Sequence, residues 1–231
     1  MKIVVLTGAG ISAESGVPTF RASDGLWEGH RVEDVATPEA YARNPALVQE
    51  FYNMRRAFLQ QVEPNAAHRA LADLEKRLGH KLTLVTQNVD DLHERGGSQH
   101  VIHMHGSLLS GLCTECRERF PWHGPMGETS ECPRCHHTGC VRPDIVWFGE
   151  MPYQMGKIEQ AVVECDLFVS IGTSGAVYPA AGLVQIAKLC EARTIEINLQ
   201  PTQNTEFFDE QRQGPAGTEV PRWVESLIAT I

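Results

Sequence analysis

The sequence lacks several features that would place it in other classes of protein. It has no run of eighteen apolar residues, which predicts no membrane-spanning helix, and no basic stretch followed by an apolar one, which predicts no signal peptide. It also has no internal repeat and no low-complexity linker. A net charge of −9 argues against general affinity for nucleic acid. We therefore expect a cytoplasmic protein with neither membrane nor nucleic-acid partners.

The chain has 231 residues, of which 42% are hydrophobic, so it can bury a real core. This length suits one domain with one or two insertions. Four of the seven cysteines form CxxC pairs, which fits metal binding in a reducing compartment better than a disulfide framework. Cys165 and Cys190 stand in apolar surroundings and are predicted to be core residues.

The first twenty residues combine an apolar strand with a glycine turn. Ile3 to Leu6 is a largely β-branched run, and Gly8, Gly10 and Ala13 follow it in G-x-G-x-x-A spacing, as they would before a helix. Such glycines let the backbone approach a pyrophosphate, and free N–H groups at a helix start favour the anion. The spacing predicts a dinucleotide site, with an ordinary strand-to-helix turn as the alternative.

A dehydrogenase of this pattern should continue with a second strand ending in Asp or Glu about 20 residues on. The segment from Thr19 to Trp27 is instead polar, aromatic and glycine-containing, and resembles a loop over the cofactor. Buried strands are expected at 82–86, 167–171 and 194–197, with helical patterns between them. This alternation predicts βαβ units, a parallel sheet and the α/β class.

Residues 32–78 have helical spacing, with Thr37 and Pro38 as a cap and first helical position. A further helix is expected to open near Asn65 and to run to Leu78, with His68 as a capping or packing residue. Residues 221–231 predict a closing amphipathic helix.

Tyr52 and Arg55 lie three residues apart and so share one face of a helix, while Arg56 points elsewhere. A half-buried tyrosine beside a solvated arginine would explain this spacing without a site. A phenol and a guanidinium on one face could also hold a carboxylate.

Polar side chains follow the strand at 82–86, where ligands bind in open α/β sheets: Gln87, Asn88 and Asp90. A simple polar loop is the alternative. Val101 to Gly106 alternates like a strand, which puts His103 and His105 on one face as metal ligands, core residues or a general base.

Two CxxC pairs give the spacing C-x2-C-x15-C-x2-C, formed by Cys113, Cys116, Cys132 and Cys135. Four thiolates at this spacing close a tetrahedral shell around Zn²⁺ and leave no open position, so one structural zinc per chain is predicted. Cys140 is a spare thiol nearby that could replace Cys135.

These motifs together resemble the sirtuin family of NAD-dependent protein deacylases. The resemblance is to the bacterial type that removes acetyl and succinyl groups from lysine, and it covers nearly the whole chain. The matching segments are G-A-G-I-S-A-E-S-G with P-T-F-R, then Q-N-V-D at 87–90, H-M-H-G at 103–106, V-W-F-G-E at 146–150, G-T-S at 172–174 and I-N-L at 197–199.

The resemblance implies a doubly wound, Rossmann-like domain at 1–24, 79–106 and 141–231. A helical module at 25–78 and a zinc-binding module at 107–140 would form a smaller lobe, with NAD and the acyl-lysine peptide in the cleft between. The acyl oxygen would attack C1′ of the ribose, nicotinamide would leave, and the acyl group would end on ADP-ribose. Malonyl groups are a further expected substrate.

The resemblance also assigns roles to residues of this sequence. His105 would be the base for a ribose hydroxyl, with Asn88 and Asp90 orienting the ribose and the amide. Substrate contacts are expected from Tyr52, Arg55, Val146, Trp147, Phe148, Gly149 and Glu150. Cofactor contacts are expected from Gly8, Ala9, Gly10, Ser12, Ala13, Thr19, Phe20, Arg21, Trp27, Gln87, Asn88, Val89, Asp90, Gly172, Thr173, Ser174, Asn198, Leu199, Gln200 and Ala216.

Three other classes stay open. A dehydrogenase would produce NADH, but its acidic second strand is missing. A protein ADP-ribosyltransferase would use the same NAD cleft and would differ only in its products. A zinc-ribbon binding module would use the CxxC unit alone, which the acidic charge and the complete α/β frame disfavour.

Overall fold

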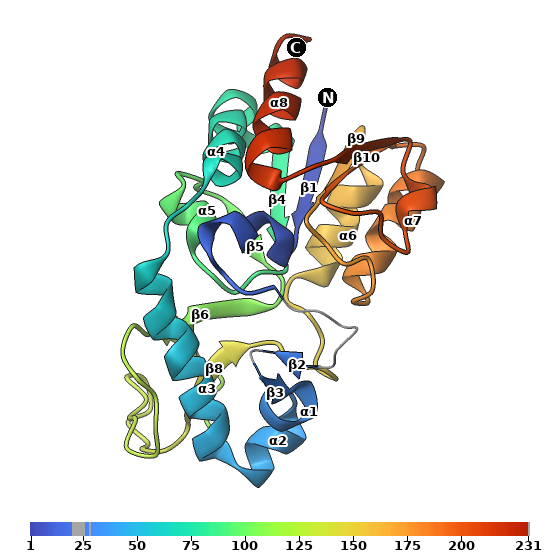
Figure 1. The fold of residues 1–231 in the computed structure, drawn as a ribbon. Coiled ribbons are helices and arrows are strands. Elements are labelled where there is room, and N and C mark those ends of the chain that lie inside the picture. The colour runs from blue at the N-terminus through green and yellow to red at the C-terminus, as the bar shows by residue number, and fades with distance from the viewer. Residues whose placement is uncertain (20–25, 28, 231) are drawn as a thin grey trace.

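The computed structural model describes residues 1–19, 26–27 and 29–230, and its largest element is a six-stranded sheet (Figure 1). All five pairings are parallel and the strand order is β11-β10-β9-β1-β4-β5. The strands are β1 Ile3–Thr7, β4 Leu82–Thr86, β5 Val101–His103, β9 Leu167–Ile171, β10 Arg193–Asn198 and β11 Glu210–Gln213. The predicted α/β class with a parallel sheet is confirmed.

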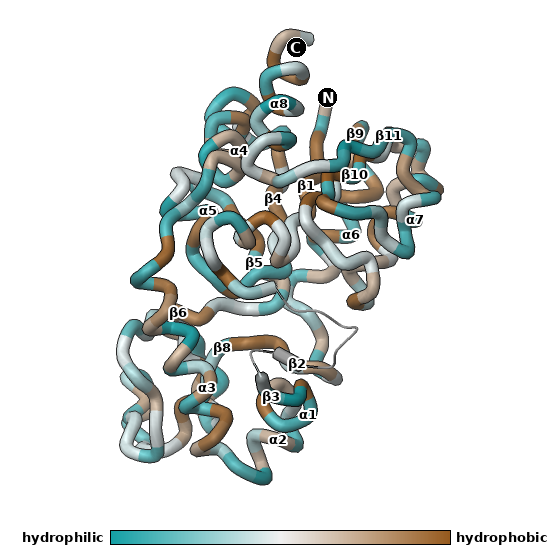
Figure 2. Tube along the Cα trace, viewed as in Figure 1, coloured by the Kyte–Doolittle hydropathy of each residue, from teal (hydrophilic) through white to brown (hydrophobic). Residues whose placement is uncertain are grey.

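Alternate residues of β1 face two separate hydrophobic cores, which is why the strand is apolar from Ile3 to Leu6. Ile3 and Val5 pack with helices α4 (Ala66–Leu78) and α8 (Ala216–Ile228). Val4 and Leu6 pack with α6 (Met155–Val163) and α7 (Leu183–Leu189) on the other face. Figure 2 shows β1 in brown between these helices. A sheet covered on both faces is the doubly wound arrangement expected from the sequence.

The smaller lobe lies at the end of the sheet away from both chain termini (Figure 1). It contains the antiparallel strands β6 Gly106–Cys113, β7 Arg119–Pro121 and β8 Val141–Ile145, and the hairpin of β2 Leu26–Trp27 and β3 His30–Arg31. Its helices are α1 Val32–Val35, α2 Pro38–Arg43 and α3 Pro45–Phe58. The remaining short helices are η1 Ala9–Ser15, η2 Leu59–Gln61, η3 Gly79–Lys81, α5 Leu92–Arg95, η4 Ala180–Gly182 and η5 Thr205–Phe207.

Local signals in the sequence place the starts of two helices, one in each lobe. The Thr37 side chain accepts a hydrogen bond from Ala40 N at 3.0 Å and Pro38 is the first helical residue of α2, as predicted. In α4 the capping box is complete, because Asn65 caps the helix and the His68 side chain accepts from Asn65 N at 3.2 Å. The predicted capping role of His68 is therefore confirmed.

The helix predicted at the glycine turn is η1, a 3₁₀ helix. Three local predictions were wrong. The strand at Val101 ends at His103, so that Met104 and His105 form a turn. Helix α8 begins at Ala216, because Pro221 is accommodated inside it. Cys165 is buried as expected, but Cys190 follows α7 and is exposed.

The division into modules stays a proposal, with one change. We propose that α4 belongs to the large domain, because it packs against α8 and the sheet. None of the helices in the described part of the chain has both the length and the apolar character that a bilayer crossing requires.

Candidate functional site

The glycine turn is fastened, backbone to backbone, to the end of the neighbouring strand β9. Gly8 N donates to Ile171 O at 3.0 Å and Gly10 N donates to Gly172 O at 2.8 Å. A Cβ on Gly10 would lie 2.7 Å from Gly172 Cα, closer than carbon atoms approach, and Gly172 itself has a φ of +61°. The turn therefore requires glycine on both sides and leaves its backbone close to the carboxyl ends of the strands.

A buried polar network joins η1 to the loop after β4. Ser12 Oγ donates to Asp90 Oδ2 at 3.1 Å and accepts from Asn88 Nδ2 at 3.1 Å. Leu92 N donates to the other carboxylate oxygen of Asp90 at 3.2 Å. Burial raises the pKa of Asp90, while these donors lower it. The network fixes Asn88 and Asp90 in one arrangement beside the glycine turn.

His105 lies in the turn between β5 and β6, with its ring fixed by a main-chain contact. Its Nδ1 is 3.1 Å from Gln87 O, and because a carbonyl only accepts, Nδ1 carries the proton and Nε2 is the basic nitrogen. Burial lowers the pKa of His105, so the ring is neutral at pH 7. The backbone is held too, since Val146 N donates to His105 O at 2.9 Å and Tyr153 N donates to Met104 O at 2.8 Å.

His103 has a different environment. Its Nε2 is 2.7 Å from Glu94 Oε1 and its Nδ1 is 3.2 Å from Asn88 O. Burial alone would lower the pKa of His103, but the hydrogen bond and charge of Glu94, together with Asn88 O and the charge of Asp90, outweigh burial and raise it. The surroundings of His103 therefore raise its pKa, whereas those of His105 lower its pKa.

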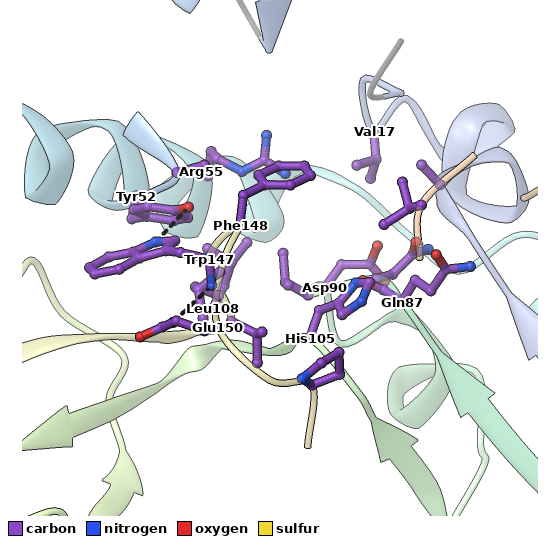
Figure 3. A pocket seen from close by; sticks show the side chains of 18 of the residues that line it. Val17, Tyr52, Arg55, Gln87, Asp90, His105, Leu108, Trp147, Phe148 and Glu150 are labelled. Atoms are coloured by element: carbon purple, nitrogen blue, oxygen red, sulfur yellow. Dashed lines mark hydrogen bonds between the residues drawn. The ribbon is translucent and has the colours of Figure 1, made fainter. Parts of the chain in front are cut away.

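A cavity of about 220 Å³ brings residues of both lobes together (Figure 3). At one end lie residues of the large domain and the His105 turn, and at the other lie α3 and the segment after β8. The predicted site residues that line it are Ala9, Tyr52, Arg55, Gln87, Asn88, Val89, Asp90, His105, Val146, Trp147, Phe148, Gly149, Glu150 and Ser174. The two expected halves of the site thus share one continuous space.

The α3 end of the cavity is built around Trp147. Its Nε1–H donates to Tyr52 Oη at 3.0 Å, and its main-chain N donates to Glu150 Oε2 at 2.9 Å. The guanidinium of Arg142 lies 3.8 Å from the centre of the indole ring and is paired with Glu150 at 2.9 Å. Tyr52 is fully buried and Arg55 is 7% exposed, and burial raises the pKa of Tyr52. The phenol is therefore neutral, and the arginine beside it is largely withdrawn from water.

Several predicted cofactor residues lie outside this cavity lining. Asn198 Nδ2 donates to Thr173 O at 2.7 Å, which joins the ends of β10 and β9, and Leu199 is exposed. Ala216 opens α8. The predictions for Phe20 and Arg21 fall outside the described residues. The others are Gly8, Gly10, Ser12, Ala13, Thr19, Gly172 and Gln200. Trp27 belongs to β2, and the prediction for its side chain falls outside what the structure describes.

The sequence reasoning missed the apolar wall of the cavity. It is contributed by Ala36, Phe58, Leu108, Ile145 and Tyr178. These residues come from five separate segments and have no common motif.

The four cysteines of the CxxC pairs converge in the smaller lobe. Their Sγ atoms all lie within 4.8 Å of one another, with 3.6 Å between Cys113 and Cys135 and 3.8 Å between Cys116 and Cys132. Four Zn–S bonds of about 2.3 Å in a tetrahedron place sulfur atoms about 3.8 Å apart. The residues fit a structural zinc ion held by four thiolates.

The chain combines a parallel sheet of this strand order, a glycine turn at the carboxyl edge of the sheet and a four-cysteine module on the other side of the cavity. This combination of features points to one family of proteins. The Sir2 family model matches residues 8–179, and the chain belongs to the Sir2 family.

Its relatives carry a common name. A Pasteurella multocida (strain Pm70) protein named NAD-dependent protein deacylase is 57% identical over 230 residues, covering 99% of this chain and 98% of its own length. A Vibrio parahaemolyticus protein of the same name is 58% identical over 229 residues, covering 98% and 95%.

Solved structures agree over the whole chain. A Sir2 homologue in complex with NAD has a TM-score of 0.89 at 41% identity, with 99% of this chain and 90% of that one covered. A Sir2 complex with a p53 peptide and NAD⁺ has a TM-score of 0.81 at 28% identity, with 99% and 94% covered. The predicted family is therefore confirmed.

Proposed function

We propose that this protein is an NAD-dependent protein-lysine deacylase that acts on acetyl-lysine and succinyl-lysine, and on malonyl-lysine as well. The observation that carries the proposal is the continuous cavity with Asn88, Asp90 and His105 at one end and Tyr52 and Arg55 at the other. The names of the relatives support the reaction class, and their complexes with NAD support the co-substrate.

When bound, NAD supplies a ribose carbon from which nicotinamide can be displaced, and its ADP-ribose part receives the acyl group. The chain's own part is to bind and orient. The glycine turn has no side chains at Gly8 and Gly10, so phosphate oxygens can approach its backbone closely. Asn88 and Asp90, held through Ser12, supply an amide and a carboxylate at fixed positions for the ribose and the nicotinamide amide.

His105 acts as the general base in this proposal. Its Nδ1 proton is held by Gln87 O, so Nε2 has the lone pair that accepts a proton from a ribose hydroxyl. The lowered pKa of His105 keeps that nitrogen unprotonated at neutral pH. The apolar wall of the cavity excludes water from the reacting atoms.

Tyr52 and Arg55 recognise an acidic acyl group. A guanidinium and a hydroxyl on one face of α3 supply charge-assisted and neutral donors for the carboxylate of a succinyl or malonyl group. Residues 146–150 line the same cavity and would receive the peptide by main-chain hydrogen bonds, as an added strand does. The proposed partners are acylated proteins of the cytoplasm. Binding of nucleic acid is not part of the proposed function.

The test is mass spectrometry of the products formed from acetyl- and succinyl-lysine forms of one peptide with NAD. The proposal predicts free lysine, nicotinamide and O-acyl-ADP-ribose from both peptides. A peptide that gains an ADP-ribosyl group while keeping its acyl group would replace deacylation by ADP-ribosyl transfer. Formation of NADH would overturn the proposal altogether.

A further inference from the structure

A fifth thiol lies against the four-cysteine cluster. Cys140 is 6% exposed, and its Sγ is 3.5 Å from Sγ of Cys113. This separation is as short as the 3.6 Å between Cys113 and Cys135, which belong to the cluster. The sequence suggested Cys140 as a substitute for Cys135, but the cluster sulfur that it contacts at this distance is that of Cys113.

Two of the cluster cysteines differ from Cys140 in the hydrogen bonds at their sulfur atoms. Sγ of Cys113 accepts from Cys116 N, and Sγ of Cys132 accepts from Arg134 N, each at 3.4 Å. Such N–H donors suit a thiolate that binds a metal. Cys140 Sγ instead lies 3.1 Å from His137 O and is not one of the four sulfur atoms that all lie within 4.8 Å of one another. Cys140 therefore lies beside the ligand shell rather than in it.

The backbone keeps Cys140 at this position. Cys113 is the last residue of β6 and is paired with Val141, the first residue of β8. The next residue along, Thr114, donates to Cys140 O twice, from its N at 2.8 Å and from its Oγ1 at 3.1 Å. None of these contacts involves the Cys113 side chain, so they would hold Cys140 in place if that side chain were lost.

We propose that Cys140 is a reserve zinc ligand that takes the place of Cys113. With Cys113 Sγ gone or blocked, the Cys140 side chain turns from His137 O toward the vacated corner of the tetrahedron. The Cys140 S–H bond breaks and releases its proton to solvent, a sulfur–metal bond forms, and the metal again has four thiolates. The deacylation reaction uses no property of Cys140, so this role is separate from the proposed function.

The test is the metal content of purified full-length variants, with Co²⁺ as a probe of the ligand number. Cys140→Ala should keep one zinc per chain. Cys113→Ala should keep one metal per chain, with an affinity within roughly 100-fold of the parent protein, the range over which changes around a ligand act. Its Co²⁺ form should keep the charge-transfer intensity of four thiolates. Cys113→Ala/Cys140→Ala should lose the metal, and so should the matched variant Cys132→Ala.

Three results would overturn the proposal. Cys113→Ala could contain as little metal as the double variant, or the Co²⁺ form of Cys113→Ala could show the charge-transfer intensity of only three thiolates. In the third, Cys132→Ala would retain as much metal as Cys113→Ala. If Cys113→Ala does not fold, the test is the rate at which zinc passes to a chelator from two folded proteins, the parent protein and Cys140→Ala. A reserve ligand recaptures the metal when Cys113 dissociates, so Cys140→Ala should release zinc roughly 10-fold faster. Equal release rates would refute the role.

Discussion

The substitution Arg55→Met tests the acyl selectivity most directly. Methionine keeps much of the aliphatic length of arginine and removes the guanidinium. Arg55 is 7% exposed and Tyr52 beside it is fully buried, so a carboxylate bound there is largely removed from water. A hydrogen bond to a charged group contributes about 1.5–3 kcal/mol in such surroundings, or roughly 10- to 150-fold in kcat/KM. Desuccinylation should fall by that factor.

The assay compares kcat/KM for succinyl- and acetyl-lysine forms of one peptide at saturating NAD. Acetyl-lysine has no carboxylate, so its loss in Arg55→Met should be far smaller than the succinyl loss. Tyr52→Phe, which deletes only the hydroxyl, should show the same selectivity more weakly. Equal losses on both substrates would mean that Arg55 supports the fold or NAD, and the selectivity argument would be refuted.

Arg56→Met is the matched control, since the neighbouring arginine is also buried in α3 but has another function. Arg56 Nε donates to Leu108 O at 2.6 Å and its Nη1 donates to Asn53 Oδ1 at 2.8 Å. Its loss should lower the melting temperature and reduce activity on both peptides by the same factor. A selective loss of desuccinylation in Arg56→Met would contradict this division of roles.

Four further outcomes are expected. His105→Ala should lower kcat by roughly 10²–10⁴-fold with little change in melting temperature, whereas unchanged turnover would exclude it as the base. Because burial lowers the pKa of His105, kcat/KM should be flat above neutrality and fall as the pH drops through that lowered pKa; a fall beginning above pH 7 would contradict it. Burial lowers the pKa of His68 to about 4. Below about pH 6.5 the unfolded chain therefore binds a proton at His68 that the folded protein does not bind, so the free energy of unfolding should decrease as the pH falls from about 6.5 toward 4. Denaturant titrations at several pH values measure this decrease. Cys132→Ala should lose zinc and destabilise the smaller lobe, and a metal-free protein that stays folded and fully active would contradict the structural role.

Where a single local signal determines an element, the sequence was sufficient to predict it. The run Leu82 to Thr86 is a strand because its apolar side chains serve a sheet covered on both faces. The Thr37–Pro38 cap and the spacing of the CxxC pairs are local too, and the structure has both as predicted. The carboxyl ends of the predicted strands likewise brought Asn88 and Asp90 to one site.

What depends on contacts across the chain could not be predicted. The bond between Trp147 and Tyr52 joins residues 95 positions apart, and nothing in either segment indicates it. The placement of α4 is also tertiary, since its apolar stripe would suit either lobe and only the packing against α8 decides. The turn at His105 begins early because Gly106, with a φ of +84°, starts a new strand directly afterwards.

The two main-chain bonds that hold the His105 turn determine which mutations this site can tolerate. Val146 and Tyr153 supply only their amide hydrogens to the carbonyls of His105 and Met104. An amide hydrogen is present in every residue except proline, so the side chain at 146 can change during evolution while the proposed base stays in register with the proposed peptide-binding segment. Substitutions in this segment can thus change which peptides bind without changing catalysis. Proline at 146 or 153 is the exception, because it removes an amide hydrogen that holds the His105 turn.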